Sequence, residues 1–367
     1  MLYKLSDVFD LQMGKTPSRD NNMYWKDGNL PWVSIADLSK SQIYIENSKE
    51  MITNLAAKDT LMKCIPQDTV IMSFKLSLGK TAITRTPLYT NEAIMAFVDK
   101  KVIQIEPKYI YFLFRNIQWG QYTNNAVKGK TLNKKFFSDF QINIPEYIQQ
   151  TKIASILIRI NKILEYKHSL IKAYDALIKS RFVELFGDPN IVKSNKCVKF
   201  SSIAKIITGN TPSRKSPEYY GDYIEWIKSD NIVSTDLYIS QAKEFLSEQG
   251  AVKGKIAPKD SLLMTCIAGS IRSIGNVGLC NRSVAFNQQI NAIVLENDIN
   301  PLYVYWLLKL FKPSIIANVE MSLKGIISKS QLENMFIPIV ASNKKQDLFA
   351  KFVLQINKLK FAQIVYN

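Results

Sequence analysis

The sequence predicts two homologous globular α/β domains joined by long antiparallel coiled-coil helices, an internal repeat with pseudo-two-fold symmetry. Three observations lead to this fold class. The chain has 367 residues, 47% of them hydrophobic, which is too long for one ordinary core. Its short motifs recur in the same order about 195 residues apart. A long stretch without glycine or proline separates the two copies, and a related stretch follows the second copy.

The clearest repeated motif is the turn Gly-x-Thr-Pro-Ser-Arg, which occurs at residues 14–19 and again at 209–214. Other pairs keep the same order: Trp32-Val33 with Trp226-Ile227, Asn91 with Asn287, residues 107–111 with 301–305, and Gln150 with Gln346. We therefore expect homologous domains over 1–145 and 188–340, a central helical spacer over 146–187 and a distal helix over 341–367.

Within each domain, strand-like and helical runs alternate. Buried strands are predicted at 69–72 and 261–264, each after a Pro-x-Asp turn, and helices at 109–115 and 303–309, each entered after a proline. Short helical turns at 136–140 and 331–335 lead into the extended segments 142–145 and 336–338. This mixture of elements indicates an α/β domain, present twice.

The central spacer shows helical periodicity. Apolar residues repeat every seven positions between Leu157 and Leu185, and Gly187-Asp188-Pro189 is a stop signal. The distal segment has a similar stripe, so we expect the two helices to pack on each other in antiparallel fashion; the alternative is that each packs on its own domain. The residues predicted to pack are Leu157, Ile160, Leu164, Ile171, Ile178, Phe352, Ile356 and Leu359. His168 lies in a polar stretch of the spacer, where we expect it at the surface.

The charge and the cysteines limit the class of protein. The net charge of +17 favours a polyanionic partner, with nucleic acid as the first candidate, although membrane-surface and ribosome-associated proteins share this feature. The four cysteines form no Cys-x-x-Cys pair and there is one histidine, so we expect no metal site. Neither a signal peptide nor a long apolar span is present, which predicts a soluble, cytoplasmic protein.

No recognisable catalytic motif occurs. Gly-Lys-Thr appears three times, but Phe9, Phe74 and Asn124 stand where a phosphate-binding loop needs its first glycine. No set of carboxylates near a lysine recurs in both halves, and a histidine-dependent site would have to use His168. The sequence therefore predicts a non-enzymatic chain without a cofactor.

Basic and amide side chains in turn-rich segments are the candidate nucleic-acid contacts, because lysines neutralise phosphates while arginines and amides can also read base edges. The candidates are Lys15, Arg19, Lys75, Lys80, Arg85, Lys128, Lys130, Lys134, Asn210, Arg214, Lys215, Arg272, Asn276, Lys324 and Lys329. Arg19 and Arg214 are shared by both halves, which favours a structural role or a phosphate contact over base reading. Arg85 and Arg272 have no basic equivalent in the other half. Positions that differ between the halves are where the two domains would read different DNA sequences.

Taken together, these motifs resemble a specificity subunit of a type I restriction-modification system. The resemblance covers essentially the whole chain, including the run Ser180-Arg181-Phe182-Val183-Glu184-Leu185-Phe186-Gly187-Asp188 and the repeated Ile-Asn-Lys. It implies that the domains are target recognition domains, each reading half of a split site in double-stranded DNA. It also implies that the helices space the half-sites and dock two modification subunits, through which restriction subunits join the complex.

Two other functions stay open at this point. One is a non-enzymatic basic adaptor that binds RNA or protein through its helices. The other is a self-contained DNA methyltransferase or nuclease with an unrecognised site.

Overall fold

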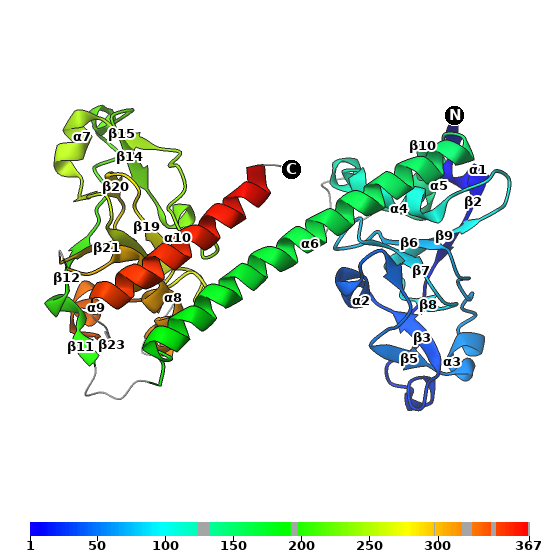
Figure 1. Ribbon diagram of the computed structural model, residues 1–367. Helices are drawn as coiled ribbons and strands as arrows, with labels where there is room; N and C mark the ends of the chain where they lie inside the picture. Colours follow the sequence, from blue (N-terminus) through cyan, green and yellow to red (C-terminus); the bar gives the residue numbers. More distant parts are fainter. Residues whose placement is uncertain (124–131, 192–196, 297, 318–324, 339–342, 366–367) are drawn as a thin grey trace. The chain divides into compact units, whose positions relative to one another are not determined.

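A computed structural model describes residues 1–123, 132–191, 197–296, 298–317, 325–338 and 343–365. The chain divides into two compact units, Met1–Glu165 and Tyr166–Asn367, which are described separately below. Helix α6 (Tyr147–Phe186) is continuous and contributes to both units. Figure 1 shows the elements of each unit in sequence colours.

The main sheet of the first unit has the strand order β2-β9-β6-β7-β4. Its strands are β2 (Phe9–Met13), β9 (Ile94–Asp99), β6 (Val70–Ser73), β7 (Thr81–Thr84) and β4 (Tyr44–Ile45). Alternate side chains enter two different cores: Met72 and Phe97 pack with helices α4 (Pro107–Asn116) and α5 (Lys134–Asp139), whereas Ile71 and Ala96 pack with Val33 on the other face. The sheet is therefore buried on both faces, which explains its nearly continuous apolar strands.

A smaller three-stranded sheet, β5-β3-β8, lies beside the main sheet. It contains β3 (Leu30–Val33), β5 (Glu50–Ile52) and β8 (Tyr89–Thr90), with α2 (Ile35–Lys40), α3 (Asn54–Asp59) and η1 (Asn22–Tyr24) around it. The short strand β1 (Leu2–Lys4) pairs with β10 (Gln141–Asn143). Helix α1 (Leu5–Val8) follows β1, and the 3-10 turn η2 (Trp119–Tyr122) follows α4.

The second unit repeats this arrangement. Its main sheet, β12-β21-β17-β19, contains β12 (Ala204–Thr208), β21 (Ile290–Leu295), β17 (Leu262–Thr265) and β19 (Val277–Leu279). Its second sheet, β13-β15-β14-β20-β16, contains β13 (Tyr220–Gly221), β15 (Phe245–Leu246), β14 (Ile224–Ile227), β20 (Val284–Phe286) and β16 (Ile256–Ala257). Two further strand pairs are β11 (Cys197–Lys199) with β23 (Phe336–Pro338) and β18 (Ile267–Ala268) with β22 (Gly325–Ile326). The helices of this unit are α7 (Glu248–Lys253), α8 (Pro301–Ala317) and α9 (Lys329–Asn334). Short 3-10 turns are η4 (Phe200–Ser202), η5 (Pro217–Tyr219) and η6 (Ser229–Asn231).

Strand pairing confirms that the two units have the same fold. Trp32 of β3 pairs in parallel with Tyr89, and Trp226 of β14 pairs in parallel with Ala285. In both main sheets the long central strand, β9 or β21, lies between an antiparallel first strand and the Pro-x-Asp strand. The predicted strands, the helices after proline and the extended segments 142–145 and 336–338 are confirmed to within a few residues, although α8 continues through Pro313 to Ala317.

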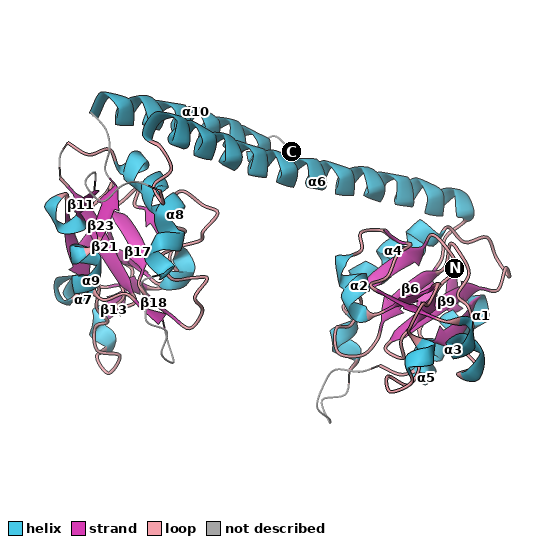
Figure 2. Cartoon of the chain, turned by 90° about the horizontal axis from the view of Figure 1, so that it is seen from below, coloured by secondary structure: helices cyan, strands magenta, loops and turns pink. Residues whose placement is uncertain are grey.

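In the second unit, the end of α6 lies antiparallel to α10 (Asn343–Val365), as Figures 1 and 2 both show. The Phe182 and Phe349 rings meet edge to face with centroids 5.3 Å apart, and Ile178 is fully buried. Helix α10 also packs on α8, so it contacts its own domain as well as α6. The arrangement thus contains both of the packings that the sequence left open.

The residues predicted to pack along the helices differ in exposure. Ile178 and Ile356 are buried, Leu157, Ile171 and Phe352 are partly buried, and Ile160, Leu164 and Leu359 are exposed. His168 is exposed. Among the described residues, no helix has the length and apolar character needed to cross a membrane.

Candidate nucleic-acid interface

The repeated Gly-x-Thr-Pro-Ser-Arg turn leads from the main sheet to the second sheet in each domain, following β2 in the first domain and β12 in the second. The amide of Gly14 donates to Ile94 O at 3.2 Å, and that of Gly209 donates to Ile290 O at 3.0 Å. A Cβ atom at either glycine would lie within about 2.2 Å of a backbone oxygen. Both glycines are therefore required by close backbone contact.

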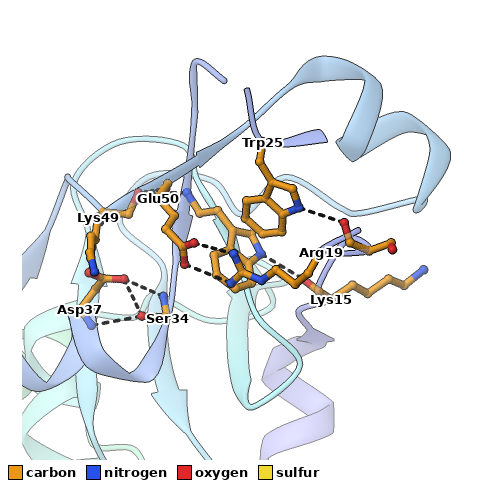
Figure 3. Close-up of polar contacts among 10 residues, drawn as sticks. Lys15, Arg19, Trp25, Ser34, Asp37, Lys49 and Glu50 are labelled. Carbon is orange, nitrogen blue, oxygen red and sulfur yellow. Dashed lines mark hydrogen bonds and ion pairs between the residues drawn. The ribbon is translucent and has the colours of Figure 1, made fainter. Parts of the chain in front are cut away.

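The arginine that ends this turn is held in the same way in both domains. The Arg19 guanidinium lies 3.9 Å from the Trp25 ring centroid and 5.0 Å from that of Trp32, and it forms two hydrogen bonds to Glu50, of 2.5 and 3.1 Å (Figure 3). In the second domain, Arg214 lies 4.4 Å from the Tyr220 centroid and 5.0 Å from that of Trp226, and donates to Glu244 at 2.6 Å. These contacts engage much of each guanidinium within its own domain.

The carboxylates in these clusters were not among the predicted site residues. The hydrogen bond from Arg19 lowers the pKa of Glu50, while Lys228 and then Arg214 lower the pKa of Glu244. A signal for both carboxylates exists in the sequence, since each follows a lysine at corresponding places in the two halves, Lys49-Glu50 and Lys243-Glu244.

Lys15 and Asn210 occupy the same place in the repeat and make the same kind of contact. Lys15 Nζ donates to Thr60 O at 2.8 Å, beyond the end of α3, and Asn210 Nδ2 donates to Lys253 O at 2.7 Å, at the end of α7. Both side chains thus satisfy carbonyl oxygens at a helix C-terminus. Their backbone oxygens accept from Trp32 Nε1 and Trp226 Nε1, respectively.

A second turn comprises residues 91–93 in the first domain and 287–289 in the second. It is hydrogen-bonded both to the Gly-x-Thr-Pro-Ser-Arg turn and to the loop that follows the Pro-x-Asp strand. Thr16 donates to Glu92 in the first domain, and Thr211 donates to Gln288 in the second. Phe74 N donates to Ala93 O at 2.9 Å, and Cys266 N donates to Gln289 O at 2.8 Å. We call the two turns, with their hydrogen bonds, the duplicated frame; it comprises residues 14–19 and 91–93, and residues 209–214 and 287–289.

The other predicted contacts lie around this frame or elsewhere on the domains. Lys80, Arg85, Lys134, Lys215, Arg272 and Lys329 are exposed, and Lys75 and Asn276 are partly buried, whereas Lys128, Lys130 and Lys324 lie outside the described residues. Arg85 is 4.6 Å from the Tyr44 ring centroid and 3.9 Å from a Glu46 oxygen. Lys134 lines a cavity of about 310 Å³ that Lys15 also lines. The predicted DNA contacts are therefore of two kinds: exposed basic residues of the surface, and residues that belong to the duplicated frame.

The described residues contain no group of three or more histidine, cysteine or acidic side chains placed to hold a metal ion. The paired carboxylates Glu50, Glu244 and Glu225 are each bound to an arginine of the same domain. Each of these carboxylates is therefore engaged in an ion pair within its own domain.

The comparison with protein families identifies the class of protein. The family model for the type I restriction modification DNA specificity domain matches residues 1–173 and 193–362. The chain therefore belongs to this family and carries its domain twice. It is a non-catalytic subunit that recognises DNA.

Individual relatives match different shares of the chain. It is 24% identical over 388 aligned residues to the type I restriction enzyme MjaIX specificity subunit of Methanocaldococcus jannaschii, covering 99% of this chain and 87% of that protein. The HindI specificity subunit of Haemophilus influenzae is 27% identical over 160 residues, which is 41% of this chain and 34% of that protein.

Solved structures have a similar fold. The crystal structure of a type I restriction-modification S subunit from M. genitalium matches with a TM-score of 0.55 and 13% identity, over all of this chain and 93% of that one. A chain from a study of complex assembly and conformational transition of the type I restriction-modification system matches with a TM-score of 0.58 and 15% identity, over 99% of this chain and 92% of that one.

Proposed function

We propose that residues 1–145 and 188–340 are two target recognition domains, each of which reads one half of a split target in double-stranded DNA. One observation carries this assignment: the two domains share a duplicated frame, while the surface loops beside it differ in length and sequence. A common frame with different loops suits a protein that binds two related but unequal DNA segments. The net charge of +17 provides attraction to the phosphates.

A domain exchange tests this assignment. We expect that replacing residues 188–340 with the corresponding segment of another family member changes one half of the methylated target and leaves the other half as it was. The measurement is mapping of methylated adenines in DNA from cells that carry the hybrid chain and its modification partner. Changes in both halves at once would contradict the modular assignment.

We propose that α6 and α10 set the spacing between the half-sites and bind two modification subunits, with restriction subunits joining through the complex. The first part of α6 supports a docking role because a row of its aliphatic side chains is 40–54% exposed. These residues are Ile153, Ile156, Ile160, Ile163 and Leu164. Exposed apolar stripes of this kind are typical of surfaces that bind another protein.

A longer helix tests the spacing role. Inserting four residues between Leu164 and Glu165 lengthens α6 by about 6 Å at 1.5 Å per residue, which corresponds to roughly two base pairs. We expect the gap between methylated half-sites to increase by about that amount, with both half-site sequences retained. An unchanged gap would show that another part of the complex fixes the spacing.

The basic-adaptor alternative makes a different prediction about nucleic acid. If the chain binds RNA, single-stranded RNA should displace duplex DNA when the two compete at the same salt concentration. We expect duplex DNA containing the split target to be displaced only by the same duplex sequence.

A further inference from the structure

Two loops leave the same position of the main sheet in the two domains. The β6–β7 loop comprises residues 74–80, and the β17–β19 loop comprises residues 266–276 and includes the short strand β18 near its start. Both are closed by the same pair of backbone hydrogen bonds: Ser73 N to Lys80 O (2.8 Å) with Gly79 N to Ser73 O (2.9 Å), and Thr265 N to Asn276 O (2.9 Å) with Gly275 N to Thr265 O (2.9 Å). The two glycines have φ values of 79° and 72°, which only glycine adopts readily.

The domain fixes the base of each loop. In the first domain Gly79 lies against the buried Trp119 ring, where a Cβ atom would be 2.8 Å from Trp119 Cδ1. In the second domain Lys312 of α8 donates to Arg272 O at 2.7 Å and to Asn276 Oδ1 at 2.5 Å. The loops are also hydrogen-bonded to the second turn of the duplicated frame, so they lie next to it in both domains.

Between these similar ends the loops have different tips. Each tip carries a basic residue next to an exposed aliphatic one, Lys75-Leu76 in the first domain and Ile271-Arg272 in the second. Leu76 is 74% exposed and Ile271 is 40% exposed. Leu76 also has a φ of 64°, a left-handed conformation that is unfavourable for leucine. The core does not hold the Leu76 side chain, which leaves it available for contact with a ligand.

Arg272 differs from the other arginines of the domains. The sequence has eight arginines, and those at 19, 85, 115, 181, 214 and 282 have a carboxylate or aromatic partner. Among the described residues, the guanidinium of Arg272 has no such partner and no hydrogen bond, and the same holds for Arg159 on α6. Arg272 is therefore a free arginine held on an anchored loop.

We propose that the tips of the β6–β7 and β17–β19 loops read base pairs in the DNA major groove. Arg272 pairs with the O6 and N7 atoms of a guanine, while Leu76 and Ile271 contact thymine methyl groups. This inference rests on the proposed function and assigns the specificity of each domain to its own loop. The duplicated frame then positions the loops without choosing a sequence.

The test in the second domain compares Arg272→Ala and Arg272→Lys with Lys259→Ala, which removes an exposed cation before β17, at the end of the strand opposite the β17–β19 loop. Each variant is assembled with the modification subunit, and methylated adenines are mapped. We expect both substitutions at Arg272 to reduce discrimination at one base pair of one half-site by about 10-fold to 100-fold. Lysine fails to rescue because it lacks the planar pair of donors. The Lys259→Ala complex should retain the wild-type target.

Three outcomes oppose the proposal in different ways. If Arg272→Ala lowers methylation of all sequences equally, the arginine contacts only the phosphate backbone, and the proposed reading role is overturned. If the target is unchanged, the loop does not read DNA. In both cases the proposed function stands, because the wild-type complex still methylates a split target. If the wild-type complex itself methylates no split target, the proposed function fails together with this inference.

Leu76→Asn gives an independent test in the first domain, because asparagine tolerates the left-handed conformation. We expect a loss of discrimination at a thymine position of the other half-site, with the melting temperature unchanged or raised. An unchanged preference in that half-site would overturn the role of the β6–β7 loop. Circular dichroism melting verifies that the variant folds.

Discussion

Lys360 Nζ on α10 donates to Asp175 Oδ1 on α6 at a distance of 2.6 Å. The Lys360 side chain is only 16% exposed, and that of Asp175 is 34% exposed. Asp175 also acts on Lys309 of α8: burial lowers the pKa of Lys309, and the Asp175 charge offsets part of that effect. One carboxylate thus links the charges of three helices in the second unit.

We expect Asp175→Asn to lower the free energy of unfolding by about 1–3 kcal/mol, because two partly buried lysines lose their counter-charge. Urea denaturation measures the change. The control is Glu184→Gln, which breaks the exposed pair with Arg181 and should change stability by less than about 0.5 kcal/mol. Equal losses in both variants would show that Asp175 is no more important than a surface carboxylate.

Arg19→Ala should destabilise the first domain by about 1–2 kcal/mol, since it removes the contacts with two tryptophans and the ion pair with Glu50. Arg19→Lys should recover only part of this loss, because an ammonium group cannot stack as a planar guanidinium does. Thermal unfolding measures both effects. Wild-type stability combined with a large loss of DNA affinity would instead indicate that Arg19 contacts phosphate.

The ion pair of Glu244 predicts a specific pH dependence. Lys228 and Arg214 hold the pKa of Glu244 below its ordinary value of 4.5, so its contribution to stability is present above that pH and is lost as the pH falls through the lower, folded-state pKa. We expect Glu244→Gln to be less stable than the wild-type chain near pH 6, with the difference shrinking as the pH falls below about 4.5. Urea denaturation at several pH values measures this; a constant difference would contradict it.

Gln150 is a buried anchor between α6 and the first domain. Its Oε1 accepts from Glu106 N at 2.9 Å, and its Nε2 donates to Gln104 O and Pro145 O at 3.1 and 2.9 Å. Gln346 repeats the first of these contacts by accepting from Asn300 N at 3.0 Å. Both glutamines are nearly inaccessible to solvent.

We expect Gln150→Leu to cost about 2–4 kcal/mol, because three backbone groups lose their hydrogen-bond partner in a buried place. Hydrogen exchange at the Glu106 amide should become faster. Gln149→Leu provides a matched control, since Gln149 is the adjacent residue and is exposed. Protection of the Glu106 amide that is the same in both variants would rule out the anchoring role.

Much of the fold was predictable because it depends on local pattern. Proline before a helix, the Pro-x-Asp turn before a buried strand and the seven-residue period of α6 each act over a few residues, and all three gave correct elements. Duplication added long-range information, since a motif that occurs twice in the same order implies the same domain twice.

The candidate site was less predictable because side-chain partners come from distant parts of the chain. Lys15 and Arg214 were predicted as DNA contacts from residue type and turn composition, yet their charges meet a helix C-terminus and Glu244. The sequence does not show which basic groups are already paired, and so it could not separate Arg214 from the free Arg272.

The sequence by itself determined that the chain contains one domain twice, that helical segments follow each copy, and that the class is a DNA specificity subunit. Only the tertiary structure decided which basic side chains are already paired within their domain. It also decided that the β6–β7 and β17–β19 loops lie next to the duplicated frame. The physical reason is the range of the interactions: helix and strand formation depends on nearby residues, whereas an ion pair such as Arg19 with Glu50 depends on how the folded chain brings distant residues together.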